Sequence, residues 1–392
     1  MTSLLRILHK HKHVPAQVQD SCASNASCNT RGASSDVAVK KQIQVQSSGA
    51  SCASCSSADV PLLELDNVNV TLFSDKQQLP ALQQVHLRMR AGETLAVVGE
   101  SGCGKSMSAL AIMGLLPTPP AKLTCGSIRF QGEDITHKTE KERQAYRGSR
   151  IGMIFQEPMT SLNPVMSAGN QICEAILAHN PRMNKHAARL RALDMLSQVG
   201  IPAPEKVYAS YPHELSGGMR QRIMIAMALA CEPELLICDE PTTALDVTIQ
   251  AQILQLLNRL KTTRGTAIML ITHDMGVVSE MADWVLVMYA GHTVEYTRAA
   301  DLFAKPLHPY TQGLIDSIPT FESTQEELYA IPGSVPMLHA MPEGCPFHPR
   351  CPFAREICKT KKPQMQQVGQ QAHHEVRCWK YSDVWEGDSH EN

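Results

Sequence analysis

Short apolar runs separated by amphipathic stretches dominate the chain from residue 62 onward. Five of these runs have the length of strands and are bounded by turn residues: Thr94–Val98, Ile151–Phe155, Leu235–Cys238, Ala267–Thr272 and Trp284–Tyr289. Helical patterns lie between the runs, and the clearest, between Asp246 and Thr263, carries one apolar face: Ile249, Ile253, Leu256, Leu257 and Leu260. Because strands that alternate with helices form parallel sheets covered on both faces, the pattern predicts an α/β fold.

Other segments of the pattern indicate additional parts. Residues 62–70 and 85–89 predict two more strands, the second at the edge of a sheet. The stretch Ala168–Met195 is predicted to be helical and is followed by a Pro-rich link, Ile201–Pro204, which indicates an inserted helical subdomain. After Tyr310 the chain becomes rich in proline, and we expect irregular structure there.

The composition narrows the class of protein. The chain has 392 residues, of which 43% are hydrophobic and 19% charged, as in globular proteins of two or three domains. The net charge of −2 and the pI near 6.8 argue against a general nucleic-acid binder, whose surface would be basic. Since no run of about 18 uncharged apolar residues occurs, we expect no membrane-spanning helix.

The first 60 residues differ from the rest. They are rich in Ser, Ala, Gln and Cys without a helical or strand period, which predicts a disordered leader. No apolar h-region of a secretory signal is present; a transit-peptide-like address and a misassigned start codon are the alternatives. Cys52 and Cys55 lie in this stretch without the βαβ context of a redox motif, so we expect no redox role for them.

A phosphate-binding loop follows the strand at Thr94–Val98. Its pattern is Gly-x-x-x-x-Gly-Lys-Ser, and its residues are Gly99, Glu100, Ser101, Gly102, Cys103, Gly104, Lys105 and Ser106. Glycines allow consecutive backbone N–H groups to surround phosphates, and the N-terminus of the following helix adds positive potential. We expect Lys105 to reach the β- and γ-phosphates of ATP and Ser106 to ligate Mg²⁺. The alternative is an ordinary Gly-rich turn.

Two carboxylates, Asp239 and Glu240, end the apolar strand at Leu235–Cys238. A carboxylate at the C-terminal end of a parallel strand points into the ligand crevice of the sheet. We therefore expect Asp239 to be a second Mg²⁺ ligand and Glu240 to orient the attacking water. Taken alone, an apolar strand that ends in two acids also fits acids that face solvent. The presence of the phosphate loop in the same chain is what favours a role in ATP hydrolysis.

The segment Leu215–Arg222, Leu-Ser-Gly-Gly-Met-Arg-Gln-Arg, resembles the signature of one family, the nucleotide-binding subunits of ABC transporters. The resemblance implies an α/β P-loop ABC ATPase with a RecA-like parallel-sheet core, an antiparallel β subdomain and a helical subdomain. It also implies that Ser216, Gly217 and Gly218, at the start of a helix, cap an ATP molecule held by a second ATPase subunit.

Shorter motifs follow in the order of this family. Phe155-Gln156-Glu157 resembles the Q-loop, which implies that Gln156 contacts Mg²⁺ and water. Ala244-Leu245-Asp246 resembles the D-loop, which places Asp246 at the dimer interface, and Thr272-His273-Asp274 resembles the switch, whose His273 senses the γ-phosphate. No aromatic residue is an evident adenine platform; Phe73 is a candidate, with a core position as the alternative.

Two longer matches narrow the resemblance to a subfamily. Gln156–Pro164 and His308–Leu314 resemble the dipeptide/oligopeptide importer ATPases, which include nickel and glutathione relatives. The resemblance covers roughly residues 62–380. It implies a subunit that hydrolyses ATP to energise import of peptides or related small solutes across the bacterial inner membrane, while the cargo stays open.

The same resemblance implies the partners. These are a second homologous ABC ATPase subunit in a heterodimer or homodimer, two transmembrane permease subunits and, indirectly, a periplasmic substrate-binding protein, with no nucleic acid. The chain would lie at the cytoplasmic face of the inner membrane, held by the permeases. The alternatives are a soluble ABC ATPase in translation or DNA repair, an exporter, and a redox or regulatory module carried on the ATPase.

Four cysteines cluster near the end of the chain at Cys345, Cys351, Cys358 and Cys378. Four thiolates can ligate zinc or a 4Fe–4S cluster, although the spacing fits neither a zinc ribbon nor a ferredoxin. The importer resemblance implies the iron–sulfur cluster; zinc, with His348, His373 and His374 as further ligands, and no metal at all are the alternatives.

These observations predict three parts. We expect a disordered leader at residues 1–60, an ABC ATPase domain at 61–310 with its helical subdomain at about 157–230, and a small irregular C-terminal extension with the cysteines at 311–392.

Overall fold

A computed structural model describes residues 60–74, 77–156, 161–243, 245–318, 330–369 and 373–387. The predicted leader, with Cys52 and Cys55, lies outside the described residues, as do Glu157 and Ala244. The described part begins at Val60, and residues 60–392 form one compact unit.

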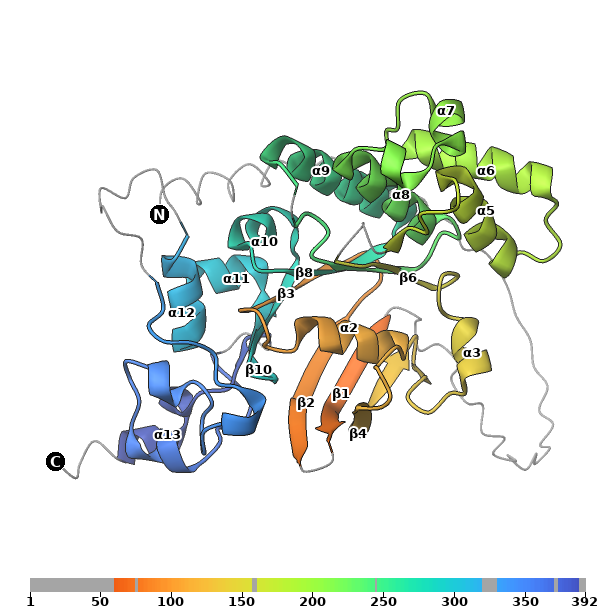
Figure 1. Cartoon of the computed structure of the whole chain (residues 1–392). Coiled ribbons are helices and arrows are strands. Elements are labelled where there is room, and N and C mark those ends of the chain that lie inside the picture. The colour runs from red at the N-terminus through yellow and green to blue at the C-terminus, as the bar shows by residue number, and fades with distance from the viewer. Residues whose placement is uncertain are drawn as a thin grey trace, which may run out of the picture. The chain divides into compact units, whose positions relative to one another are not determined.

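The predicted parallel sheet is present and forms the centre of this unit (Figure 1). Its parallel strands are β9 (Trp284–Tyr289), β3 (Thr94–Val98), β8 (Ala267–Thr272), β7 (Leu235–Asp239) and β6 (Ile151–Ile154), in this spatial order. Nearly every residue in these strands is buried, as expected for a sheet covered on both faces. Antiparallel strands β10 (His292–Arg298), β12 (Glu375–Val376) and β11 (Gln366–Gln367) extend the sheet beyond β9.

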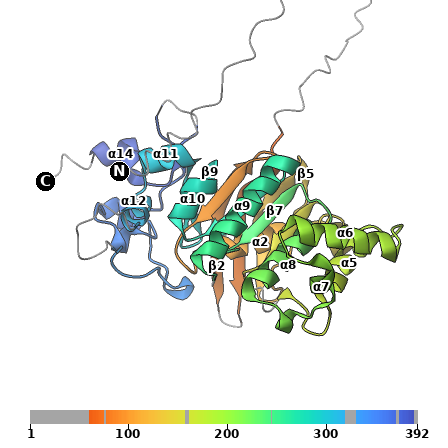
Figure 2. The same cartoon turned by 90° about the horizontal axis from the view of Figure 1, so that it is seen from above.

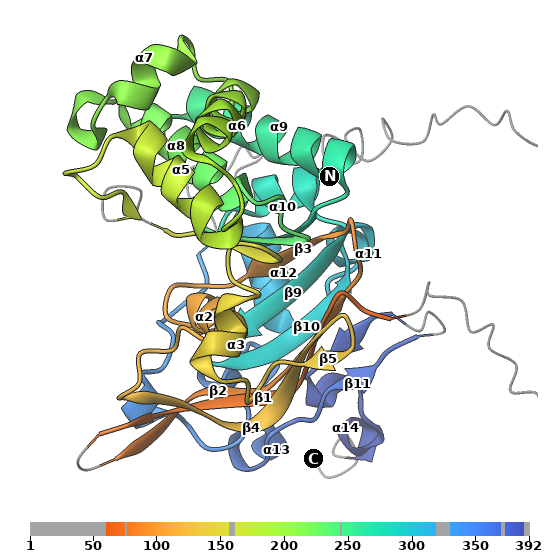
Figure 3. The ribbon, with the colours of Figure 1, turned by 90° about the vertical axis from the view of Figure 1, so that its right-hand side faces the viewer.

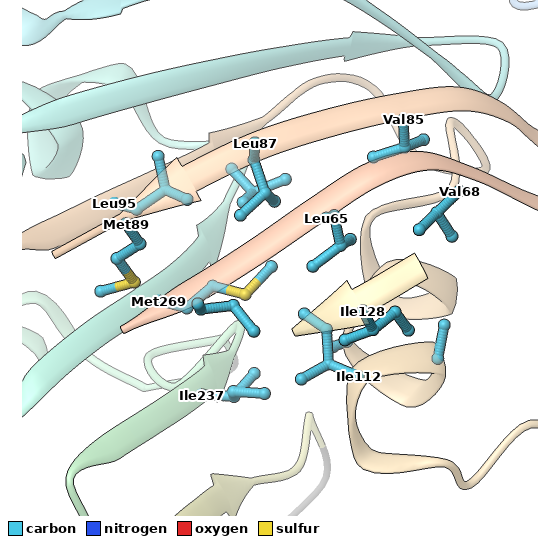
Figure 4. Packing of buried hydrophobic residues seen from close by; sticks show 14 of the residues in the cluster. Leu65, Val68, Val85, Leu87, Met89, Leu95, Ile112, Ile128, Ile237 and Met269 are labelled. Carbon is cyan, nitrogen blue, oxygen red and sulfur yellow. The ribbon is translucent and has the colours of Figure 1, made fainter. Parts of the chain in front are cut away.

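A second, antiparallel sheet packs against the first. Its order is β2 (Gln78–Met89), β1 (Leu63–Phe73), β4 (Ala121–Phe130) and β5 (Glu133–Asp134), so β2 is the predicted edge strand. Figure 4 shows apolar side chains of β1 and β2 facing those of the parallel strands, with Ile112 of helix α2 beside them. The helix that follows the phosphate loop is therefore enclosed between the two sheets.

Helices cover both faces of the parallel sheet and continue into the C-terminal region (Figures 1 and 2). They are α2 (Lys105–Met113), α3 (Glu140–Gln144), α5 (Ala168–His179), α6 (Lys185–Gln198), α7 (Pro204–Ala209), α8 (Gly217–Leu229), α9 (Val247–Arg264), α10 (Met275–Met281), α11 (Ala299–Ala304), α12 (Pro309–Asp316), α13 (Glu356–Thr360) and α14 (Asp383–Gly387). Short 3₁₀ turns are Pro212–Glu214, Leu338–Ala340, His348–Arg350 and Trp379–Tyr381.

The face of the parallel sheet opposite α2 carries the helical subdomain. Alternate strand residues, such as Leu236 and Ile268, join one core cluster with α5, α6, α8 and α9. Figure 3 shows α5 to α8 gathered at one end of this unit, beyond the parallel strands. The sheet thus separates α2, after the phosphate loop, from α8, after the signature segment.

The structure corrects the sequence prediction in three segments. Ala168–Met195 is two helices, because Asn180–Asn184, with Pro181, interrupts the chain between α5 and α6. The supposed Pro-rich link contains the start of α7, since Pro204 occupies the first helical turn, where its missing N–H costs nothing. The region after Tyr310 includes α12, and β12 pairs with β10 of the main sheet, so it is less irregular than expected.

No helix in the described part of the chain is long and apolar enough to cross a membrane.

Candidate functional site

The phosphate loop connects β3 to α2, and at two of its positions, Gly99 and Gly104, only glycine fits. Gly99 has φ +149°, and a Cβ there would lie 2.2 Å from the backbone oxygen of Met288. Gly104, with φ +104°, ends the loop at the first turn of α2, where a Cβ would lie 2.6 Å from Leu82. The backbone therefore curls tightly in front of the helix N-terminus, the arrangement in which N–H groups surround an anion.

The lysine and serine of this motif, Lys105 and Ser106, are the first two residues of α2. The buried ammonium of Lys105 donates to the backbone oxygens of Gly99, at 2.7 Å, and Glu100, at 3.0 Å. The Ser106 hydroxyl donates to Oδ1 of Asp239 at 3.0 Å. The structure thus brings the ends of β3 and β7 together, as the sequence predicted from two segments 133 residues apart.

The environment of Asp239 disfavours its charged form. Burial raises the pKa of the Asp239 carboxyl, while the hydrogen bond from Ser106 and the charge of Lys105 oppose this rise. The carboxylate is thus poorly solvated where it faces the loop. In the loop itself, burial raises the pKa of the Cys103 thiol, which packs in the core, whereas Ser101 and Gly102 are exposed.

Glu240 is the centre of a second group of polar contacts. Its carboxylate accepts hydrogen bonds from Nε2 of Gln156, at 3.1 Å, and from the Thr243 hydroxyl, at 2.9 Å. Nδ1 of His273 lies 3.5 Å from the other carboxylate oxygen. Gln156, Glu240 and His273 follow β6, β7 and β8, three neighbouring parallel strands, so their shared edge brings the side chains together. The contribution of Thr243 was not predicted.

The signature residues are placed differently. Ser216 caps α8 by accepting from the backbone N–H of Met219, and Ser216 and Gly217 are exposed. A Cβ on Gly217 would meet no atom within 4 Å, whereas one on Gly218 would lie 3.1 Å from Ile249. In Figure 1, α8 and α2 lie on opposite sides of the parallel strands. The exposed N-terminus of α8 therefore belongs to the face of the sheet opposite the helix that follows the phosphate loop.

Asp246 and Phe73 have structural positions of their own. The carboxylate of Asp246 caps α9 by accepting from the backbone N–H of Ile249 at 3.0 Å. Phe73 ends β1, where it pairs with Gln78, and its side chain is partly exposed. Neither position by itself assigns a nucleotide contact to these residues.

The four C-terminal cysteines line one small cavity, together with His308, Phe347, His348 and Trp379 among others. Burial raises the pKa of the thiols of Cys345, to about 12, of Cys378, to about 11, and of Cys351. The neighbouring cysteines add to the rise in the pKa of the Cys345 and Cys378 thiols. Residues between His308 and Trp385 thus converge on one cysteine-lined cavity.

The suggested histidine ligands do not all reach this cavity. His348 lines it, with Nδ1 2.9 Å from the backbone oxygen of Cys345. His374 Nε2 instead lies 2.7 Å from Oε1 of the buried Glu295, and His373 packs edge-on against Trp284. Among the described residues, no group of three or more His, Cys, Asp or Glu side chains is arranged to hold a single metal ion.

Sequence reasoning missed two contacts to the phosphate loop from the C-terminal region, meaning the chain from α11 onward (residues 299–387). The Arg350 guanidinium forms a bidentate ion pair with Glu100, and the Tyr310 hydroxyl accepts from the Glu100 backbone N–H. The motif around His308 indicated a subfamily but not this contact, and no local signal marks Arg350.

Comparison with known proteins identifies the class first. The family model described as ABC transporter matches residues 82–243. The dimeric post-hydrolysis structure of the ATP-binding cassette MJ0796 bound to ADP and Pi is similar, with a TM-score of 0.55 and 28% identity over 60% of this chain and 98% of that one. The predicted fold class is confirmed, and the protein is an ABC transporter ATPase.

The subfamily follows from longer similarities. The model described as oligopeptide/dipeptide transporter, C-terminal region, matches residues 294–358. The oligopeptide transport ATP-binding protein AppD of Bacillus subtilis is 50% identical over 82% of this chain and 97% of that protein. OppD of Salmonella typhimurium, also an oligopeptide transport ATP-binding protein, is 51% identical over 77% and 89%. The chain belongs to the ATP-binding proteins of the oligopeptide/dipeptide ABC transporter family, as the sequence motifs predicted.

Proposed function

We propose that this chain hydrolyses ATP to energise the import of oligopeptides or dipeptides across the bacterial inner membrane. The observation that carries the proposal is the convergence of Gln156, Glu240 and His273 beside the Ser106–Asp239 pair, at one edge of the parallel sheet. The high identity to oligopeptide transport ATP-binding proteins supports the direction and the class of cargo.

ATP would be bound mainly by the phosphate loop. The backbone N–H groups from Gly99 to Ser106 and the ammonium of Lys105 would hold the β- and γ-phosphates. In this structure Lys105 donates to two loop carbonyl oxygens, and those weak acceptors would be exchanged for charged phosphate oxygens.

The residues present fit a magnesium ion. The Ser106 hydroxyl, the Asp239 carboxylate and the Gln156 amide oxygen are hard oxygen donors, the type that Mg²⁺ prefers. Because burial leaves the Asp239 carboxylate poorly solvated, a bound cation would stabilise its charge. When bound, the ion neutralises charge on the transferred phosphoryl group.

Glu240 would orient the attacking water. The hydrogen bonds from Gln156 and Thr243 fix its carboxylate, which can accept a proton from water aligned with the γ-phosphate. The water oxygen forms a bond to phosphorus as the bond to the bridging oxygen of ADP breaks, and the proton leaves with the phosphate products. His273, next to Glu240, would sense the γ-phosphate.

A second ATPase subunit would complete the site. Ser216, Gly217 and Gly218 offer a helix N-terminus that is open toward solvent, which suits an anion presented by another molecule. The similar MJ0796 cassette is a dimer, which supports this reading. We place Asp246 at the same interface. Two permease subunits would hold the pair at the cytoplasmic face of the membrane, with the substrate-binding protein acting indirectly.

We also propose a 4Fe–4S cluster as a resident of the cysteine-lined cavity. All four cysteine side chains line this one cavity, and four cysteine thiolates are the usual protein ligands of a 4Fe–4S cluster. Beside the cavity, the buried Arg377 donates to Gln84 and to the backbone oxygen of Thr293 but forms no ion pair with a described carboxylate. Burial lowers the pKa of the Arg377 guanidinium, and the negative charge of a Cys345 thiolate would oppose this effect.

A cluster of this kind can exchange one electron or serve as a covalent staple. The test is iron and acid-labile sulfide analysis of the chain purified without oxygen, beside a Cys351→Ser variant. About four irons in the parent and a loss in the variant are expected; a parent with neither iron nor sulfide would refute the cluster.

The transport proposal is tested by isolating the full chain from its native membranes in a mild detergent. Mass spectrometry should find two multi-span proteins and a second, similar ATPase, and the purified assembly should hydrolyse ATP. Recovery of only ribosomal or DNA-repair proteins would overturn the transport role while leaving the ATPase intact.

A further inference from the structure

Glu100, the second residue of the phosphate loop, is held by the C-terminal region at two of its groups. Arg350 donates from Nη1 to Oε2 and from Nη2 to Oε1, both at 3.0 Å, and its own side chain is only 6% exposed. The Glu100 backbone N–H donates to the hydroxyl of Tyr310 at 2.8 Å. A bidentate pair with a buried guanidinium fixes both position and orientation.

The third group of Glu100 connects this contact to the site. Its backbone oxygen accepts from the ammonium of Lys105 at 3.0 Å. Side chain, N–H and C=O of one residue are therefore all engaged, two by the C-terminal region and one by the lysine that would bind phosphate. A change in the contact between Arg350 and Glu100 would therefore alter the position of the Lys105 ammonium, because Lys105 donates to the backbone oxygen of Glu100.

Arg350 is itself held in place. Its Nε donates to the backbone oxygen of Pro332 at 2.8 Å, and its guanidinium lies over the rings of Tyr289 and Phe347. These contacts orient the guanidinium independently of Glu100. The ion pair with Glu100 therefore costs little further side-chain entropy.

The turn that carries Arg350 lies between two cysteines of the cavity. Cys351 follows Arg350 directly and donates its backbone N–H to His348, while the N–H of His348 donates to the backbone oxygen of Cys345. Any group that binds Cys345 and Cys351 would therefore brace this turn.

We propose that Arg350 is a positioning residue for ATP binding, which sets the phosphate loop through Glu100 and links it to the cysteine-lined cavity. The positioning role of Arg350 is supported by these contacts alone. The link to the cavity means that a group bound there would strengthen the contact between Arg350 and Glu100, and this link rests on the proposed cluster.

The sign of the effect follows from the charges. Without Arg350, the Glu100 carboxylate loses its counter-ion within a loop that must bind a polyanion, so ATP is repelled. We expect Arg350→Gln to raise KM for ATP roughly tenfold, the size of an uncompensated charge several ångströms from phosphate. The kcat at saturation should change less than about twofold, because Glu240 and its partners are untouched.

The experiment is a double-mutant cycle on the assembled transporter, read as KM against kcat for ATP hydrolysis. Glu100→Gln added to Arg350→Gln removes the repelling carboxylate and should restore most of the KM. Lys359→Gln is the matched control, because it removes a cation from the same region but from an exposed pair with Glu356. Arg350→Lys, which keeps the charge, should give an intermediate KM and replaces Arg350→Gln if that variant does not fold.

Two results would overturn the positioning role: a control that raises KM as much as Arg350→Gln, or a double variant that is as impaired as the product of both single changes. The link to the cavity is tested by Cys351→Ser, which should raise KM in the parent and add nothing in Arg350→Gln. If Cys351→Ser raises KM equally in both, the link fails. Iron analysis of the parent decides the cluster separately, so the two failures are distinguishable.

Discussion

Glu295 offers a sharp test of how the C-terminal region is joined to the ATPase core. This residue of β10 is fully buried, and its carboxylate accepts from the backbone N–H groups of Leu307, at 2.8 Å, and His308, at 2.9 Å. His374 Nε2 lies 2.7 Å from the same group. One carboxylate therefore fixes the segment before α12 and a residue near β12.

The substitution Glu295→Gln keeps the shape and removes one acceptor. In one orientation its amide nitrogen would face the backbone N–H of His308, and in the other it would face the backbone N–H of Leu307 together with His374, so at least one buried donor loses its partner. A hydrogen bond to a charged group contributes about 1.5–3 kcal/mol, and an unsatisfied buried donor costs about 1–3 kcal/mol. Since these two quantities overlap, we expect the free energy of unfolding to fall by about 2–4 kcal/mol.

The assay is urea unfolding of the full chain, followed by circular dichroism. Glu356→Gln is the control, because Glu356 is 77% exposed and its ion pair with Lys359 lies on the surface. It should change stability by less than about 1 kcal/mol. Equal stability losses in the two variants would refute the role assigned to the buried carboxylate.

Three further predictions concern the ATP site and the core. Glu240→Gln should keep ATP binding but lower turnover about 10²- to 10⁴-fold, measured by phosphate release; near-normal turnover would remove its water-orienting role. Gly99→Ala should abolish ATP binding and destabilise the chain, whereas Gly265→Ala, which has positive φ but no neighbour within 4 Å, should cost only about 1 kcal/mol by urea unfolding. Burial lowers the pKa of His292 to about 4. Because the unfolded chain binds this proton below about pH 6.5 and the folded chain does not, stability should fall by up to about 1.4 kcal/mol per unit as the pH drops from 6.5 toward 4, and His292→Asn should remove that part of the slope.

The sequence alone was enough to predict the elements that have a local sequence pattern. Strands β3, β7 and β8 are continuous apolar runs, and the phosphate loop has a fixed spacing, so both could be predicted within a residue or two. The approach of Ser106 to Asp239 also followed, since the C-terminal ends of parallel strands share one edge.

The remaining features depend on contacts that have no local pattern. Arg350 and Glu100 are 250 residues apart, and nothing in either neighbourhood marks them as partners. Strand β12 has two residues, too few to show a period, and its pairing with β10 is visible only once the region has folded. Pro181 lies in the break between α5 and α6. A proline inside a helical pattern indicates such a break, and the prediction of one helical stretch did not use it.

The C-terminal region is attached to the core by an apolar cluster, in which Tyr310 and Phe347 pack against Tyr289, and by polar contacts. The polar contacts are made at Glu100, at Glu295 and, through Arg377, at Gln84 and Thr293. Such contacts stabilise one orientation, because a small shift leaves a buried charge or donor without its partner. A region fixed in this way, which contacts the phosphate loop at one end and encloses a cysteine cavity at the other, is suited to transmit a change in the cavity to ATP binding rather than to serve as a passive cover.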